Sequence, residues 1–195
     1  MKKVVALILS VMLLGILVGC TNDTKITNKG PEASNSASAQ TPTGNEVTAK
    51  DGFGEGRMGD IMHTYFFDYT VNSAYVDTAY EDYTPAEGNE LLIAEVTVKN
   101  TSRESIEMYD TDFQCQWNSD GEDDYSFPIT VNHQESSGKQ LPETYTLAVN
   151  ETVVGLLVFE VPEGNCDFSI SYEETFESKN EGNLFFVYFT AETDK

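Results

Sequence analysis

The sequence predicts an all-β domain in which two antiparallel sheets pack face to face, and three observations support this. Short runs of alternating apolar and polar residues recur along the chain, as expected of strands with one buried and one solvated face. Turn signals rich in Pro, Gly, Asn and Asp separate these runs. No segment shows sustained helical periodicity. Many short strands joined by such turns indicate a two-sheet β-sandwich.

Two kinds of strand are expected. Strict alternation predicts half-buried strands at residues 92–98, 113–117 and 168–172. Runs that are β-branched and aromatic on both faces predict central or covered strands at residues 65–71, 152–161 and 184–190. The acidic residues Glu173 and Glu174, which follow one of these strands, are expected on the solvated rim.

Charge and composition narrow the class of protein. The chain has 195 residues, with 33 acidic against 11 basic residues and a formal net charge of −22. Nucleic acid is excluded as a partner, because binding phosphates requires clustered Lys and Arg and no basic run exceeds Lys2-Lys3. The hydrophobic content of 39% is too high for a wholly disordered chain, and the length fits one folded domain.

The N-terminus has the order of a secretory signal. The basic start Met1-Lys2-Lys3 precedes an apolar run that ends in Leu17-Val18-Gly19-Cys20, which resembles the lipobox of bacterial lipoproteins. We expect residues 1–19 to form a cleaved signal helix and Cys20 to be lipidated, anchoring the protein to the extracellular face of the cell membrane. The alternatives are an ordinary signal peptide with an incidental cysteine, and an uncleaved membrane anchor.

A polar segment separates this signal from the predicted domain. All 22 aromatic residues lie between Phe53 and Phe189, and the segment before them is rich in Ser, Thr, Asn, Ala, Gly and Pro. A segment that cannot bury apolar surface stays disordered. The sequence therefore predicts a flexible tether at residues 20–52 and a folded domain at residues 53–195.

Two cysteines are candidates for a disulfide. Cys115 shares the parity of Phe113 and Trp117, and Cys166 shares the parity of Phe168, so both thiols are expected to face the core. In the oxidising environment of a secreted protein, a Cys115–Cys166 bridge near Trp117 would give an immunoglobulin-like core. The alternative is two separate buried cysteines.

Catalytic motifs are missing from the sequence. His63 and His133 have no neighbours at ligand spacing, and we expect both to be structural or solvated. The sequence contains neither the nucleophile elbow Gly-x-Ser-x-Gly nor the zinc-protease motif His-Glu-x-x-His. It also lacks a glycine-rich phosphate-binding loop and cysteine pairs at zinc-binding spacing. We therefore expect a protein that is not an enzyme and needs no cofactor.

The segment 118–124 gathers acids in a pattern superficially like a calcium loop. Carboxylates on alternate residues can converge on a hard cation, but a glutamate is missing at the closing position, which His133 occupies. We expect a charged hairpin here rather than a metal site. The residues that would serve as metal ligands are Asp120, Glu122, Asp123 and Asp124.

The folded part resembles a known family between Gly59 and Phe189. The matching elements are Thr70-Val71-Asn72-Ser73, the stretch from Glu87 to Thr101, Asp112-Phe113, Asp120-Gly121 and the stretch from Asn150 to Pro162. They resemble the bacterial lipoprotein domain called domain of unknown function 4352 (DUF4352), which is grouped with telokin-like, immunoglobulin-type sandwiches and with a mycobacterial immunoprotective secreted antigen. The resemblance implies an immunoglobulin-like fold and an extracellular location, and it brings no catalytic residues.

The leading functional hypothesis is a surface lipoprotein whose domain is a non-enzymatic binding or interaction module. Exposed tyrosines interleaved with acids are the candidate contacts with a protein or envelope partner, although they could equally line sheet edges. These tyrosines are Tyr75, Tyr80, Tyr83 and Tyr109. The alternatives are a Ca²⁺-dependent binding module and a cell-wall hydrolase using a pair of carboxylates.

Overall fold

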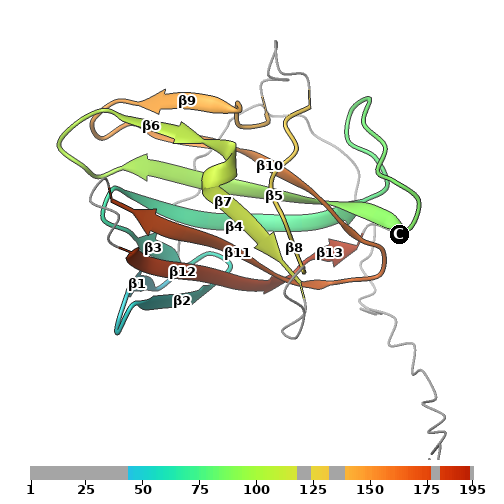
Figure 1. The fold of residues 1–195 in the computed structure, drawn as a ribbon, viewed down its shortest axis with the longest axis horizontal. Helices are drawn as coiled ribbons and strands as arrows, with labels where there is room; N and C mark the ends of the chain where they lie inside the picture. Colours follow the sequence, from blue (N-terminus) through green and yellow to red (C-terminus); the bar gives the residue numbers. More distant parts are fainter. Residues whose placement is uncertain (1–43, 118–123, 132–138, 177–180, 194–195) are drawn as a thin grey trace, which may run out of the picture. The chain divides into compact units, whose positions relative to one another are not determined.

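The computed structural model describes residues 44–117, 124–131, 139–176 and 181–193, and these residues form a β-sandwich (Figure 1). The strands are β1 (Glu46–Thr48), β2 (Phe53–Arg57), β3 (Ile61–His63), β4 (Phe67–Asp77), β5 (Asn89–Asn100), β6 (Ile106–Tyr109), β7 (Phe113–Gln116), β8 (Tyr125–Ser126), β9 (Thr144–Leu147), β10 (Thr152–Pro162), β11 (Asp167–Thr175), β12 (Glu181–Thr190) and β13 (Glu192–Thr193). The short 3-10 helix η1 (Asp110–Asp112) precedes β7. Within the described ranges, no helix is long and apolar enough to cross a bilayer. The predicted signal lies outside them.

Two sheets form the layers. Sheet A has the order β1-β3-β4-β5-β10, with β13 paired to β4, and sheet B has the order β2-β12-β11-β7-β8. The strands β6 and β9 form a separate two-stranded ribbon at the upper edge in Figure 1. All long strands pair antiparallel, as predicted, while the short strands β1, β2 and β13 pair parallel to their neighbours. The sheets are therefore mixed at the segments contributed by the two ends of the domain.

The inner faces of the two sheets form one continuous core, and the alternation predicted for β5 is confirmed on this face. Leu92, Ala94, Val96 and Val98 of β5 are all buried. The half-buried strand predicted at residues 168–172 is wrong on its outer face, because Ser169 and Ser171 of β11 are buried as well. An aromatic group at the centre of the core joins the layers, with ring centroids between 4.6 and 6.5 Å apart. Its members are Phe67, Tyr69, Phe113 and Tyr172. Aromatic pairs at these separations stabilise a core by about 0.5–1.5 kcal/mol beyond their burial.

The fold begins earlier than residue 53. β1 lies in sheet A, and a tight turn with positive φ at Asp51 and Gly52 leads the chain to β2 in sheet B. The buried carboxylate of Asp60 accepts hydrogen bonds from the Asn45 backbone and side chain and from the Arg57 backbone. The N-terminal strand is therefore held by backbone pairing and one carboxylate, not by aromatic burial, which is why composition alone placed it in the tether.

The predicted disulfide is not formed. Cys115 is buried on β7, directly opposite Ile170 of β11. Cys166 lies four residues before Ile170 and is only half-buried. At about 3.4 Å per residue the two positions are roughly 14 Å apart along the strand direction, beyond the limit of about 7 Å between bridged Cα atoms. The even spacing of the two positions predicts side chains on one face, but the strand pairing leaves the two cysteines too far apart for a bridge.

Three of the four candidate tyrosines cover the outer face of sheet A. Tyr75, Tyr80 and Tyr83 are half-buried against a second apolar cluster of Leu91, Ile93 and Val158. The Tyr83 hydroxyl donates to the Glu160 carboxylate, which also accepts from the Ala86 backbone and the Asn89 amide. These tyrosines therefore have a packing role, whereas Tyr109 is 43% exposed.

Candidate functional site

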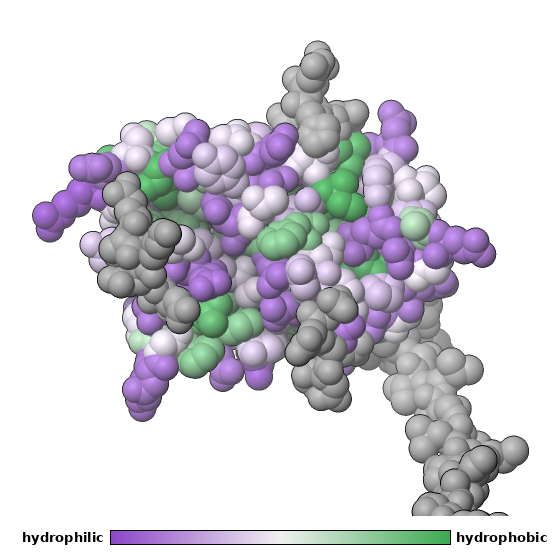
Figure 2. Space-filling model, viewed as in Figure 1, coloured by the Kyte–Doolittle hydropathy of each residue, from purple (hydrophilic) through white to green (hydrophobic). Residues whose placement is uncertain are grey.

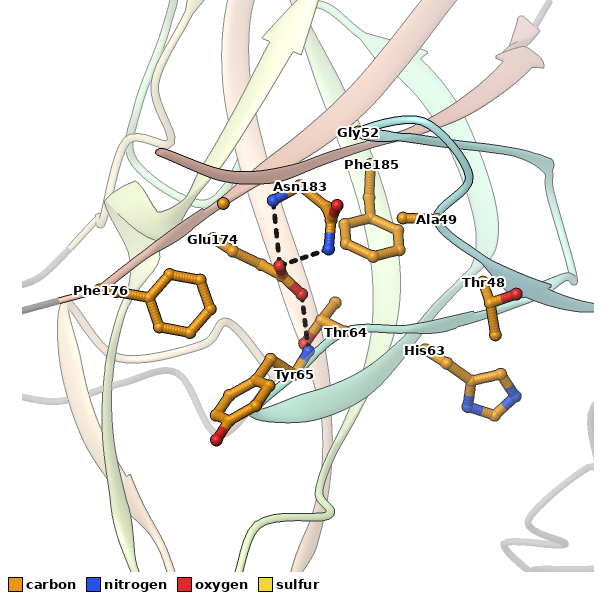
Figure 3. A pocket seen from close by; sticks show the side chains of 11 residues that line it. Thr48, Ala49, Gly52, His63, Thr64, Tyr65, Glu174, Phe176, Asn183 and Phe185 are labelled. Atoms are coloured by element: carbon orange, nitrogen blue, oxygen red, sulfur yellow. Dashed lines mark hydrogen bonds between the residues drawn. The ribbon is translucent and has the colours of Figure 1, made fainter. Parts of the chain in front are cut away.

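The end pocket is an open cavity of about 570 Å³ at one end of the sandwich (Figure 3). It lies where the turn before β4, the end of β11 and the start of β12 meet, so both sheets contribute to its wall. Its lining residues are Thr48, Ala49, Gly52, His63, Thr64, Tyr65, Glu174, Phe176, Gly182, Asn183 and Phe185.

Glu174 is the buried acid of this pocket, with 2% of its surface exposed. Its Oε1 accepts from the Tyr65 backbone N–H at 2.7 Å. Its Oε2 accepts from the Asn183 backbone N–H at 3.0 Å and from the Asn183 side-chain amide at 2.8 Å (Figure 3). The carboxylate thus ties the turn before β4 in sheet A to β12 in sheet B. A carboxylate with N–H donors on both oxygens is held in one orientation.

An aromatic edge borders the buried acid. The Tyr65 ring contacts Phe66 and Phe176 edge to face, with centroids 5.0 and 5.2 Å away. Tyr65 itself is 70% exposed. The pocket therefore presents an aromatic ring to solvent beside a wall of backbone and amide groups, which suits contact with a partner of mixed polarity.

His63 lies on the rim, on the side of the pocket away from Phe176 (Figure 3). Its Nδ1 is 2.8 Å from Asp68 Oδ1, and its Nε2 is 4.0 Å from Glu46 Oε2. The histidine therefore links β1, β3 and β4 along the edge of sheet A. His133, the other histidine, lies outside the described residues.

A second cavity of about 300 Å³ lies between β6, η1, β11 and the start of β4. We call it the aromatic–acidic cavity. Its lining residues are Phe66, Phe67, Ile106, Glu107, Met108, Tyr109, Asp112, Tyr172, Glu173 and Thr175. The exposed candidate tyrosine of the sequence, Tyr109, belongs to this cavity.

A third hollow of about 530 Å³ lies at the other end of sheet B. Arg57 places its guanidinium 5.1 Å from the centre of the Tyr188 ring, and Phe186 stacks beside Tyr188 with centroids 5.9 Å apart. This cation–π pair fills the space over Tyr188 with the protein's own cation. Figure 2 shows that the viewed face of the sandwich is largely hydrophilic, with hydrophobic residues in small separate areas.

The structure describes the Cys115 thiol and one of the four candidate metal ligands. Burial raises the pKa of the Cys115 thiol far above its ordinary value, so the reactive thiolate does not form there. The metal candidates Asp120, Glu122 and Asp123 lie outside the described residues, whereas Asp124 is half-buried and accepts a backbone hydrogen bond from Trp117. Among the residues that the structure describes, no three His, Cys, Asp or Glu side chains converge as metal ligands.

The expectation that Glu174 lies on a solvated rim is wrong, because its side chain is buried. Glu174 shares the parity of Phe168, Ile170 and Tyr172, whose side chains face the core. The alternation along β11 therefore predicts an inward side chain at position 174, whereas the acidic character of Glu174 predicts a solvated one. Its neighbour Glu173 is exposed, as expected.

Fold and cavities together define a β-sandwich domain with an open pocket between the sheets at one end. Residues 57–182 match the family described as domain of unknown function (DUF4352), and the chain belongs to this family. The resemblance drawn from the sequence is thereby confirmed. No curated protein matches the sequence significantly.

The chain is similar to several solved structures of bacterial proteins. The Bacillus subtilis protein YcdA, described as a candidate lipoprotein, superposes with a TM-score of 0.51 at 14% identity, over 67% of this chain and 38% of its own. This chain thus spans well under half the length of YcdA. A candidate lipoprotein of Staphylococcus aureus gives 0.48 at 7% identity, over 71% and 97% of the two chains. An uncharacterised β-sandwich protein of Clostridium difficile gives 0.42 at 14% identity, over 70% and 93%. The likeness to YcdA shows the fold alone.

Proposed function

We propose that the protein is a lipid-anchored lipoprotein of the bacterial cell surface whose sandwich binds a partner at the end pocket without catalysing a reaction. In this proposal residues 1–19 are the signal peptide, Cys20 carries the lipid, and the segment up to β1 is the tether. The lipobox-like Leu17-Val18-Gly19-Cys20 and the descriptions of YcdA and the Staphylococcus aureus protein as candidate lipoproteins support the anchor.

One observation carries the non-enzymatic role. Glu174, the buried acid of the end pocket, has both oxygens engaged by N–H donors. A catalytic acid or base must direct an oxygen at its substrate, whereas these three bonds direct both oxygens of Glu174 at the protein's own N–H groups. The pocket therefore has a fixed shape and an exposed aromatic contact in Tyr65, which are properties of a binding site.

The anchor is tested by Cys20→Ser in the full chain. We expect this variant to leave the membrane fraction or to accumulate as an uncleaved precursor, because the acyl chains supply the membrane affinity. Fractionation followed by mass spectrometry of the N-terminus is the measurement. Normal processing with unchanged membrane retention would contradict lipidation.

The binding role is tested by photo-crosslinking on intact cells. A benzoylphenylalanine at position 65 should capture a defined partner, while the same probe at Tyr125, an exposed tyrosine on β8, should not. Equal capture at both positions, or none at position 65, would contradict a partner at the end pocket. Turnover of any wall polymer by the purified domain would contradict the non-enzymatic role.

A further inference from the structure

We propose that the aromatic–acidic cavity binds a small alkylated ammonium ion. This inference concerns a site separate from the end pocket and does not depend on the function proposed for that pocket. It is carried by the walls of the cavity, by its charge and by its size.

Four aromatic residues line the cavity. They are Phe66 from the turn before β4, Phe67 from β4, Tyr109 from β6 and Tyr172 from β11. Aromatic faces carry partial negative charge and attract cations within about 6 Å of the ring centre, most strongly when the cation sheds little water on binding. Ammonium groups that carry alkyl substituents meet this condition, because their surface is apolar and their charge is spread.

The charge of the lining is wholly negative. Three carboxylates, those of Glu107, Asp112 and Glu173, line the cavity together with no Lys or Arg. Asp112 accepts the Tyr109 backbone N–H through Oδ2, at 2.8 Å, and Glu107 accepts the Tyr109 hydroxyl at 2.8 Å. In the part of the chain that the structure describes, Asp112 Oδ1 has no hydrogen-bond partner. One oxygen of Asp112 thus has no protein donor, and the negative lining disfavours an anion in the cavity.

Size and chemistry favour an organic cation over a metal ion. Ca²⁺ takes six to eight oxygen ligands, and the described carboxylates do not converge in the way a metal site requires. A volume of about 300 Å³ is at the lower end for ligand pockets and admits an ammonium ion that carries a few carbon atoms. Met108 and Ile106 complete an apolar wall that such substituents can contact.

Choline is the probe for the test, and 3,3-dimethylbutanol, which has the same shape but no charge, is its control. Isothermal titration on the purified domain should detect choline at millimolar concentration or below, and should detect neither 3,3-dimethylbutanol nor KCl at the same concentration. Equal binding of choline and the neutral alcohol would overturn the proposal. So would the absence of choline binding at about 10 mM, a concentration above the expected dissociation constant.

Variants locate the binding in the cavity. We expect Tyr109→Ala to weaken choline binding about tenfold, because it removes one exposed wall, and Tyr109→Phe to change it by less than about threefold. Tyr125→Ala, at an exposed tyrosine outside the cavity, should have no effect. If Tyr109→Ala does not fold, Glu173→Gln at an exposed position gives the same test through charge. Unchanged affinity in the folded variants would overturn the assignment.

Binding to lipid vesicles decides whether the ammonium group belongs to a lipid headgroup or to a free solute. Retention of the domain on phosphatidylcholine vesicles, but not on phosphatidylglycerol vesicles, would assign the ammonium group to a lipid headgroup. Binding of free choline without vesicle retention would assign it to a solute. Retention on phosphatidylglycerol alone would contradict the proposal, since that lipid carries no ammonium group.

Discussion

The end pocket and the aromatic–acidic cavity are built from neighbouring residues of the same two segments. Thr64 and Tyr65 line the pocket while Phe66 and Phe67 line the cavity, and along β11 Glu174 and Glu173 line one each. Both sites therefore combine aromatic rings with carboxylates. They differ in the supply of N–H donors, because three donors reach Glu174 whereas one reaches Asp112. Glu174 is thus bound by the fold through both oxygens, whereas Asp112 accepts an N–H donor through one oxygen only.

The largest expected effect concerns Glu174. Replacing it by Ala should lower the free energy of unfolding by about 3 kcal/mol, since three donors lose a charged acceptor in a buried position. Urea denaturation followed by the fluorescence of Trp117 measures this loss. Glu174→Gln should also destabilise, because its amide group turns a donor toward the donors of Asn183 or Tyr65.

The adjacent residue provides the matched control. Glu173→Gln, on the exposed side of β11, should change the free energy of unfolding by less than about 0.5 kcal/mol. Similar losses for the substitutions at positions 173 and 174 would show that the buried carboxylate does not clamp the two sheets.

A smaller effect is expected at Asp112. Its carboxylate caps the backbone N–H of Tyr109 at the start of η1, and Asp112→Ala should lower the free energy of unfolding by about 1 kcal/mol. Asp112→Asn keeps an acceptor and should retain most of the stability while weakening choline binding. A loss at Asp112 as large as that at Glu174 would remove the distinction between the two sites.

The smallest effect is a dependence on pH. Burial, aided by the neighbouring Asp110 charge and opposed by the Tyr109 N–H, raises the pKa of Asp112 above its ordinary value. A raised pKa means that the folded protein takes up a proton before the unfolded chain does, so acidification through this interval stabilises the fold. The wild type should therefore gain stability relative to Asp112→Asn as the pH falls from neutral toward the unfolded pKa of about 3.9. Parallel urea titrations at several pH values measure the gain, and parallel curves for the two proteins would contradict it.

Much of the fold could be predicted because alternation is a local property of the chain. Val96 and Glu95 of β5, for example, point to opposite faces wherever the strand lies in the sheet. Register is not local, and the failure of the Cys115–Cys166 bridge shows this, since four residues of offset leave the parity unchanged. β1 was missed for a related reason, because its pairing with β3 depends on backbone groups that every residue carries.

The sequence predicts less about the two sites than about the fold. Tyr109 was identified as a candidate contact, but nothing nearby in the sequence indicates that it meets Phe67 and Tyr172 at one cavity. For Glu174 the sequence carries two opposing indications, because its position in the alternation predicts an inward side chain and its charge predicts a solvated one. The donors that decide this conflict come from Tyr65 and Asn183, and Tyr65 is more than a hundred residues away along the chain.

The parallel pairing of β2 with β12 has a consequence for how the protein acquires its structure. β2 is among the first strands of the sandwich to be synthesised and β12 is the last long one, so sheet B cannot be completed until β12 has been made. Pairings of such long sequence separation slow folding, because chain entropy is lost before contacts compensate for it. If the chain is exported through a translocation channel, as proposed above, it must remain extended during passage, and sheet B is completed only after β12 has crossed.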